Sequence, residues 1–485
     1  MNRKVLFIIS VTLFAFVNLS AQRNPDAYKK GYQFSVKIKG IQNDTLYFGN
    51  YFANQQYSID TAILDKKGVF KFKNDDKEMF PGMYFFVTPE GKYFEVIIDP
   101  VKENLNFEIE TSEANLVMEL KVKGSAQNKL FYDYNKYNQG MYLKLDSIKK
   151  ADNLSDEDFK KLRTDFGKMV DSNKVLFMEQ NPDHFLTKML NATKEIDLPD
   201  SPKDENGKYI DTTFIDYLRM YYREHYFDNM PLDWDGLVRT PKAVFYDRLD
   251  GYFEHVLKYM PADSIIKYVD LLIEKTRPSK EVFKYVVWYL SDKYLKSNIL
   301  GYDAVYVHMI ERYYMSGDAF WVSPSAIEEE GKRAMKWKNL LIGKTAPELI
   351  TKDLDGKWIS LHGLKNKFTI LVFWSPDCGH CRTEIPALHE FYKNNREKYD
   401  IEVYAVNTEF QDDDKWKEFL KKNNIDLWIN TSGGEANIDW REVYDVFKTP
   451  IIYLLDEDKR ILGKQLSQEA LEIIIKDVLA GKKMF

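Results

Sequence analysis

From about residue 30 to residue 110, apolar and polar residues alternate, which is the pattern of β-strands with one buried face. Phe34, Val36 and Ile38 are the clearest case. Further segments of this kind, separated by turn residues, are 45–48, 69–72, 84–87, 94–98 and 105–109. The pattern predicts a small antiparallel β-sandwich or barrel inside a β-rich domain of residues 22–125.

From about residue 126 the apolar residues recur every three or four positions, which is the period of an amphipathic helix. This spacing is clear in segments 214–227, 245–260 and 281–295. Ser155, followed at once by acidic residues, predicts the start of another helix. We therefore expect an all-α region over residues 126–338.

After about residue 339, predicted strands and helices alternate. Residues 368–373 and 401–406 are continuous apolar runs, as in strands that are buried on both faces of a parallel sheet. The other predicted elements are a hairpin over 349–361, a strand at 451–455 and helices at 384–392, 414–423 and 467–481. This order predicts an α/β domain over residues 339–485, with helices on both faces of a central sheet.

The N-terminus has the order of parts found in a secretory signal peptide. Arg3 and Lys4 precede an apolar run over residues 5–17, and small residues end at Ala21. That run is shorter than the ~20 residues that a membrane-spanning helix needs. We expect a signal peptide over residues 1–21 and a mature chain without a membrane span in the periplasm, where disulfides persist. The formal net charge of −6 provides no basic excess for binding nucleic acid.

The chain has two cysteines, Cys378 and Cys381, separated by a glycine and a histidine. They follow the strand predicted at 368–373, and functional sites in α/β sheets gather at the carboxyl ends of strands. A cysteine in the first turn of a helix faces free backbone N–H groups, which stabilise the thiolate. We therefore expect Cys378 to be the attacking sulfur. Cys381, one turn later, is then placed to attack the mixed disulfide and release the partner.

Other uses of the two cysteines fit the sequence less well. A zinc site needs about four ligands, and no further cysteine is available to complete one. A structural disulfide between these positions would close a very small loop and gain little entropy. The sequence thus favours a redox-active dithiol that needs neither a metal nor a cofactor.

Three segments carry a resemblance to a known family. They are 343–361 (GKTAPELITKDLDGKWISL), 373–386 (FWSPDCGHCRTEIP) and 448–458 (KTPIIYLLDED). Together they resemble the thioredoxin superfamily, and most of all the exported TlpA/ResA-type thiol–disulfide oxidoreductases, which are also catalogued with the AhpC/TSA proteins. The resemblance covers about residues 339–485. Residues 30–330 resemble the β-domain and helical region often fused to such domains in Bacteroidetes.

The resemblance implies roles for residues around the dithiol. Trp374 stands where the family has a tryptophan just upstream of its active site, and Thr449-Pro450 matches the cis-proline loop that faces the two cysteines. We expect Pro450 to belong to the catalytic site, and Trp374 and Thr449 to contact the substrate. Pro386 matches the proline that kinks the helix after the active site.

One residue of the site departs from thioredoxin itself. Val372 stands where thioredoxin has a buried aspartate, while Glu384 matches a glutamate of the TlpA/ResA-type proteins. Glu384 projects about 60° from Cys381 around a helix axis. It can accept the proton of that thiol if it is partly buried, and the alternative is a solvated glutamate on the helix surface.

His380 lies between the two cysteines and resembles the residue of protein disulfide isomerase rather than the proline of thioredoxin. A protonated imidazole near Cys378 would stabilise its thiolate and make the couple more oxidising. The negative charge of Asp377 opposes this effect.

These patterns predict an exported thiol–disulfide oxidoreductase that exchanges disulfides with cysteine-containing envelope proteins, acting as a reductase. A separate redox partner would recharge the dithiol. His380 favours a disulfide oxidase or isomerase as the alternative. The size of the N-terminal part, with its many Tyr and Phe residues, favours another alternative, an envelope binding module with an accessory redox domain.

Overall fold

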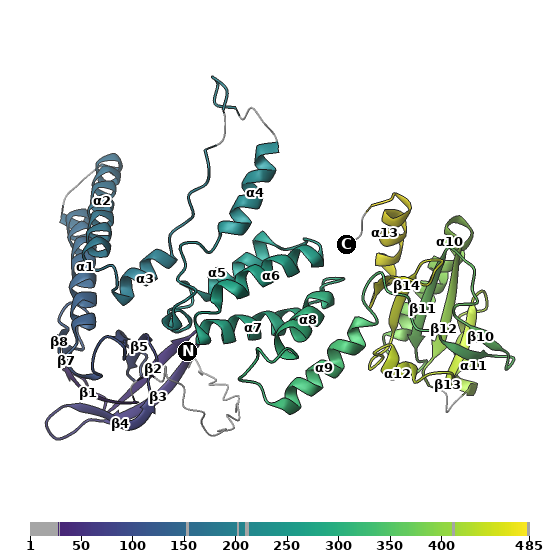
Figure 1. Ribbon diagram of the computed structural model, residues 1–485, viewed down its shortest axis with the longest axis horizontal. Helices are drawn as coiled ribbons and strands as arrows, with labels where there is room; N and C mark the ends of the chain where they lie inside the picture. The colour runs from purple at the N-terminus through teal and green to yellow at the C-terminus, as the bar shows by residue number, and fades with distance from the viewer. Residues whose placement is uncertain are drawn as a thin grey trace. The chain divides into compact units, whose positions relative to one another are not determined.

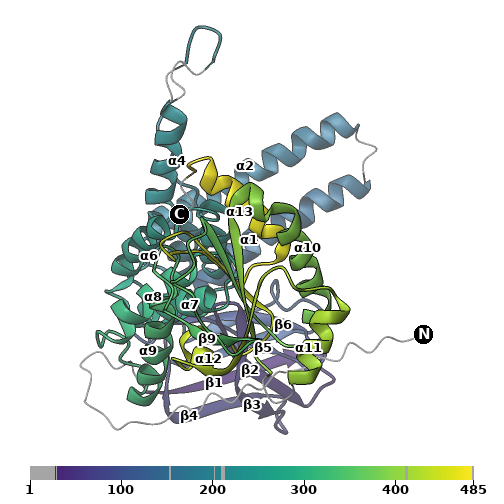
Figure 2. The ribbon, with the colours of Figure 1, turned by 90° about the vertical axis from the view of Figure 1, so that its right-hand side faces the viewer.

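The computed structural model describes residues 28, 30–151, 155–200, 203–208, 213–409 and 413–482 (Figures 1 and 2). The signal peptide predicted for residues 1–21 lies outside these residues. The chain divides into two compact units. One extends to Ala192 and includes Gly236–Tyr246, and the other contains Thr193–Asp235 and the chain from Asp247 onward. The predicted helical region is shared between the two units, and the predicted domain boundaries remain predictions.

The first unit begins with a β-sandwich. Within the described residues its strands form two sheets, with the orders β4-β1-β7-β8 and β3-β2-β5-β6. The strands are β1 (Lys30–Lys39), β2 (Thr45–Phe52), β3 (Gln55–Ile63), β4 (Phe70–Glu78), β5 (Gly82–Val87), β6 (Tyr93–Ile98), β7 (Asn106–Ser112) and β8 (Lys121–Lys123). The ring of Phe34 in one sheet lies 5.3 Å from that of Phe48 in the other, and Phe72 lies 5.2 Å from Phe86. The alternating apolar residues therefore form the core between the two sheets.

The sandwich differs from the prediction in two respects. β1 and β7 pair in parallel, whereas an antiparallel arrangement was expected throughout. β3 was not predicted, because its sequence QQYSIDTAI is largely polar and exposed. β3 is the edge strand of its sheet, beside β2, and is mostly exposed. It can therefore form without the alternating apolar residues that reveal a half-buried strand in the sequence.

Helices follow the sandwich in the first unit. They are α1 (Ala126–Ala151), α2 (Asp156–Gln180) and α3 (Phe185–Ala192). α1 and α2 lie side by side (Figure 1). The helix start predicted at Ser155 is confirmed, because its side chain accepts a hydrogen bond from the backbone N–H of Asp158 at the start of α2. Across the described part of the chain, none of the helices combines the length and the apolarity required to cross a membrane.

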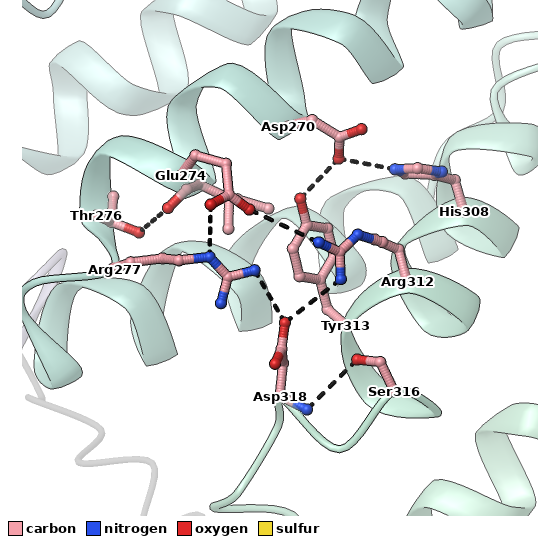
Figure 3. Close-up of polar contacts among 10 residues, drawn as sticks. Asp270, Glu274, Thr276, Arg277, His308, Arg312, Tyr313, Ser316 and Asp318 are labelled. Carbon is pink, nitrogen blue, oxygen red and sulfur yellow. Dashed lines mark hydrogen bonds and ion pairs between the residues drawn. The ribbon is translucent and has the colours of Figure 1, made fainter.

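The second unit starts with further helices. They are α4 (Thr213–His225), α6 (Ala262–Thr276), α7 (Lys280–Leu295), α8 (Asp303–Met309) and α9 (Pro324–Lys338), with short helices at Asp235–Arg239, Tyr246–Gly251, Tyr252–Val256 and Ile310–Tyr314. A polar network joins α6 to the chain around α8 (Figure 3). Asp270 accepts hydrogen bonds from His308 and Tyr313, and the guanidinium groups of Arg277 and Arg312 both pair with Asp318. The hydrogen bond between His308 and Asp270 thus helps to hold α8 against α6.

The C-terminal part of the second unit is the predicted α/β domain. Its described strands form one sheet with the order β10-β9-β13-β12-β11-β14-β15. The strands are β9 (Ile350–Asp353), β10 (Trp358–Ser360), β11 (Phe368–Trp374), β12 (Ile401–Asn407), β13 (Ile429–Ala436), β14 (Ile451–Leu455) and β15 (Ile461–Lys464). The helices are α10 (Cys381–Tyr399), α11 (Asp413–Lys422), α12 (Trp440–Val443) and α13 (Gln468–Leu479).

β11 is an interior strand of this sheet, and every one of its residues is buried. It pairs in parallel with β12 and antiparallel with β14. Val372 and Trp374 face a core formed with α10, α11 and α13, whereas Leu371 and Phe373 face a second core formed with α12. Helices on both faces of the sheet were predicted, and this arrangement confirms the predicted fold class. The carboxyl end of β11 is where the two cysteines follow.

Candidate active site

Cys378 and Cys381 lie in the connection from β11 to α10. The backbone N–H of Cys378 donates to the Ser375 carbonyl at 3.2 Å, and the Cys378 carbonyl accepts from the backbone N–H of Arg382 at 3.2 Å. Cys378 was predicted to lie in the first turn of the helix. The structure corrects this, because α10 begins at Cys381 and Cys378 precedes it by three residues. Cys378 nonetheless points its sulfur at the free N–H groups of the helix start, as the next contacts show.

The two thiols have different surroundings. Both are free, with Cys378 half-buried and Cys381 completely buried, 0% exposed. The backbone N–H of Cys381 donates to the Cys378 sulfur at 3.4 Å. The Cys378 sulfur is thus accessible to solvent, whereas the Cys381 sulfur is buried next to it.

The loop before β14 completes the site. The Thr449-Pro450 peptide bond is cis, as predicted. The Sγ–H group of Cys378 donates to the backbone carbonyl of Thr449 at 3.1 Å. Thr449 and Pro450 are both half-buried and lie beside the dithiol, because β14 pairs with β11.

These contacts separate the acidities of the two sulfurs. Burial raises the pKa of the Cys381 thiol from 9.0 to about 12, and the neighbouring Cys378 sulfur adds to the rise. Burial also opposes ionisation of Cys378, but hydrogen bonds to its sulfur outweigh this effect. They come from the Thr449 side chain, from Cys381 and from the backbone of His380, so the pKa of Cys378 is lowered from its ordinary value of 9.0. Cys378 is therefore the better thiolate and the better nucleophile at neutral pH.

Trp374 does not occupy the position expected of a substrate-contacting residue. Its side chain is fully buried, and its ring packs 5.1 Å from that of Phe419. A ring without exposed surface cannot touch a bound segment, so we correct its expected role. Trp374 ends the buried strand and supports the turn that carries Cys378, and its carbonyl accepts the backbone N–H of Thr408 at 2.8 Å.

His380 and Glu384 are near the dithiol in sequence, but the structure does not join either side chain to a sulfur. His380 is exposed, and Glu384 is half-buried. Among the described residues, neither side chain makes a hydrogen bond or an ion pair. Their catalytic roles remain predictions. Pro386 lies inside α10, as the resemblance implied.

Several contacts around the dithiol were not predicted. Lys415 of α11 pairs with Asp377 at 3.0 Å, and the Arg382 side chain donates to the Pro376 carbonyl at 3.2 Å. Both contacts hold the loop that carries Cys378. The sequence showed the helix that bears Lys415, but not that it folds back onto this loop. The sequence also provided no reason to expect Phe447 near the site. It lies two residues before Thr449 and is 73% exposed.

An accessible, acidified cysteine, a buried cysteine three residues later and a facing cis-proline loop, all at the end of a buried interior strand, define a thioredoxin-like thiol–disulfide oxidoreductase. Comparisons with known proteins agree. The AhpC/TSA family model matches residues 342–463, and that of a domain of unknown function, DUF4369, matches residues 32–131.

Individual proteins match the same C-terminal region. The thiol-disulfide oxidoreductase ResA of Bacillus thuringiensis subsp. konkukian is 31% identical over 147 residues, which are 30% of this chain and 82% of that protein. ResA of a Bacillus cereus strain is 30% identical over 135 residues, which are 28% of this chain and 75% of that protein. A crystal structure of a domain of a possible thiol-disulfide isomerase from Cytophaga hutchinsonii is 35% identical, with a TM-score of 0.28, covering 29% of this chain and 95% of that one. Through its C-terminal domain, the chain belongs to the ResA family of thiol–disulfide oxidoreductases.

Proposed function

We propose that Cys378 and Cys381 are the redox-active pair of an exported reductase that acts on disulfides of cell-envelope proteins. The observation that carries this proposal is the difference between the two sulfurs. Cys378 is accessible and has a lowered pKa, while Cys381 is buried and has a raised one. The signal peptide predicted over residues 1–21 supports export.

The reaction follows from this difference. The Cys378 thiolate attacks one sulfur of a substrate disulfide, and the other substrate sulfur leaves with the electron pair and takes up a proton. Cys381 then loses its proton and attacks the Cys378 sulfur, which breaks the mixed disulfide and releases the second substrate thiol. The substrate gains two electrons and two protons, and the enzyme is left with a Cys378–Cys381 disulfide. A separate dithiol partner must reduce that disulfide before the next cycle.

Cys381 needs a proton acceptor for the second step, because burial raises the pKa of its thiol to about 12. Glu384 is half-buried and one turn further along α10. We assign it as the acceptor, acting directly or through a water molecule. The loop at Thr449-Pro450 supplies a backbone edge against which an extended substrate segment can pair.

The redox state of the dithiol in the cell tests the direction of electron flow. Cells are quenched with acid, free thiols are alkylated, and the fraction of Cys378 and Cys381 that was reduced is measured. A reductase is kept mostly as the dithiol by its partner. A protein found mostly as the disulfide would instead be an oxidase, as the His380 position suggested, and the reductase proposal would be rejected.

Trapping in the Cys381→Ser variant tests the envelope partners. This variant keeps the attacking sulfur but cannot resolve the mixed disulfide, so substrates should remain attached to Cys378. Cys378→Ser is the matched control and should trap nothing. Several trapped exported proteins are the expected result, whereas no trapped protein in either variant would favour the binding-module alternative.

Phe447 should contribute to the recognition of protein substrates. Its ring is exposed two residues before the Thr449 carbonyl that contacts Cys378, so a bound segment can cover it. Partial burial of the ring is worth about 1 kcal/mol, and Phe447→Ala should therefore lower kcat/KM for insulin reduction by about 5-fold. Exchange with glutathione disulfide, which lacks a long extended segment to lie along this loop, should not change.

Phe320 provides the matched control for this variant. It is also exposed, at 63%, but belongs to the loop that precedes α9. Phe320→Ala should reduce insulin at the rate of the wild type. An equal loss for both variants, or an equal loss of the glutathione reaction in Phe447→Ala, would show that Phe447 has no part in substrate recognition.

A further inference from the structure

The last turn of α9 is attached to the segment that leads into the cis-proline loop. The indole Nε1–H group of Trp337 donates to a carboxylate oxygen of Asp445 at 3.0 Å. The ammonium group of Lys336 lies 3.5 Å from the other oxygen of Asp445 and 2.7 Å from Glu442. The same ammonium group lies 4.9 Å from the centre of the Phe447 ring. Two consecutive residues of the helical region thus contact Glu442 of α12 and two residues of the segment after it, Asp445 and Phe447.

This attachment is more protected from solvent than an ordinary surface ion pair. The side chains of Lys336 and Asp445 are 19% and 21% exposed. One turn earlier on the same helix, Lys332 pairs with Glu328, and these side chains are 74% and 68% exposed. Solvent screens the exposed pair far more strongly, so such a pair contributes little to structure. The Asp445 contacts therefore constrain the position of the chain, whereas the Lys332 pair does not.

Asp445 is the point at which the chain changes direction towards the dithiol. Its φ angle is +55°, a left-handed conformation that is uncommon for a non-glycine residue, although aspartate adopts it more readily than most. The backbone N–H of Val446 donates back to the Arg441 carbonyl at 2.9 Å and closes the turn. Three residues, the buried Val446 and the exposed Phe447 and Lys448, connect Asp445 to Thr449, and the Phe447 ring also contacts Lys336. The contacts with Lys336 and Trp337 thus hold the start of the short connection that leads to Thr449.

We propose that Lys336 and Trp337 are positioning residues of the redox site, which act through Asp445 to hold the Thr449 main chain and side chain against the Cys378 sulfur. This inference rests on the proposed role of Cys378 as the attacking sulfur. It gives the end of the helical region a function in the exchange reaction, although neither residue touches a cysteine.

The expected consequence concerns the thiolate of Cys378. The Thr449 side chain is among the groups whose hydrogen bonds lower the pKa of Cys378. If the loop moves away, that hydrogen bond is lost and the thiolate becomes less stable. The other titratable or charged groups on the elements around the sulfur are Asp377 with its partner Lys415, His380, Cys381, Arg382 and Glu384, which lie outside α9 and the turn at Asp445, and Lys448 directly before Thr449.

The test uses three variants of the full chain: Lys336→Met, Trp337→Phe and Asp445→Asn. The rate of Cys378 alkylation by iodoacetamide is measured as a function of pH, and the modified cysteine is identified by peptide mass. Loss of one hydrogen bond to the thiolate should raise the apparent pKa of Cys378 and slow its alkylation at neutral pH by roughly 3- to 10-fold in Lys336→Met and Trp337→Phe. Asp445→Asn keeps an acceptor for the indole N–H, so its effect should be smaller.

Lys332→Met is the matched control, since it removes a lysine from the same helix without touching the segment after α12, and its alkylation profile should equal that of the wild type. Thermal unfolding is recorded for every variant. A Lys336→Met or Trp337→Phe variant that unfolds at a lower temperature but keeps the wild-type profile would overturn the inference and leave only a structural role. If instead Cys378 of the wild type reacts no faster than Cys381, the proposed function itself is wrong.

Discussion

Replacing Cys378 with serine should abolish the reduction of a protein disulfide, by roughly three orders of magnitude or more, because the variant has no sulfur that can reach the substrate. Cys381 remains, but it is completely buried and burial raises the pKa of its thiol to about 12. The measurement is turnover of insulin by the full chain, with dithiothreitol as the electron donor. Serine is close to cysteine in size, so the half-buried position of Cys378 should tolerate the change without loss of fold.

Cys381→Ser is the informative partner of this variant. It should also stop turnover, but it should still consume one equivalent of disulfide and accumulate the mixed disulfide on Cys378. Loss of turnover in both variants with accumulation in only one assigns the two steps to the two sulfurs. Accumulation on Cys381 in the Cys378→Ser variant would reverse the assignment.

The second large effect is the difference in alkylation rate between the two thiols of the reduced protein. Burial raises the pKa of the Cys381 thiol to about 12, whereas hydrogen bonds lower the pKa of Cys378 from 9.0, so the two values differ by more than about 3. At neutral pH the thiolate fractions therefore differ by at least about 1,000-fold. The Cys381 thiolate is the more basic of the two and therefore intrinsically more reactive. With a Brønsted coefficient near 0.5, this offsets the difference in thiolate fraction by about 30-fold. Cys378 should thus react at least about 30-fold faster, and the burial of Cys381 adds to this ratio.

The pH dependence of alkylation checks the same account independently. The rate at Cys378 should rise with pH through a midpoint below pH 9 and level off above that midpoint, as its thiolate becomes fully formed. The rate at Cys381 should still be rising at that pH, because the pKa of its thiol is higher. Peptide mapping after timed alkylation distinguishes the two. Equal rates, or a faster Cys381, would show that the structure assigns the nucleophile wrongly.

The dithiol and the facing loop could be predicted from the sequence because local patterns define both. A continuous apolar run predicts the buried strand 368–374, and two cysteines at its carboxyl end indicate the site. The predicted position of Cys378 relative to α10 was less accurate, because the chain makes a turn over residues 375–380 before the helix begins. The burial of Trp374 was missed for another reason. A tryptophan at a strand end has the same local pattern whether its ring faces solvent or the Phe419 side of the core.

Elements and contacts that depend on residues far apart in the sequence could not be predicted. β13 has the sequence INTSGGEA, in which glycines and small polar residues give little strand preference, and it forms only because β12 and β9 flank it. Trp337 and Asp445 are 108 positions apart. No spacing rule relates such residues, so the connection between α9 and the loop before β14 becomes visible only in the folded chain.

A redox titration of the full chain tests the central claim most directly. The protein is equilibrated in buffers of reduced and oxidised glutathione, the thiols are quenched with acid, and peptides are mapped by mass. We predict that a single two-electron couple links the dithiol to a Cys378–Cys381 disulfide, and that any glutathione adduct formed as an intermediate is at Cys378. Two independently modified cysteines, or a stable glutathione adduct at Cys381 with no internal disulfide at any buffer ratio, would contradict it.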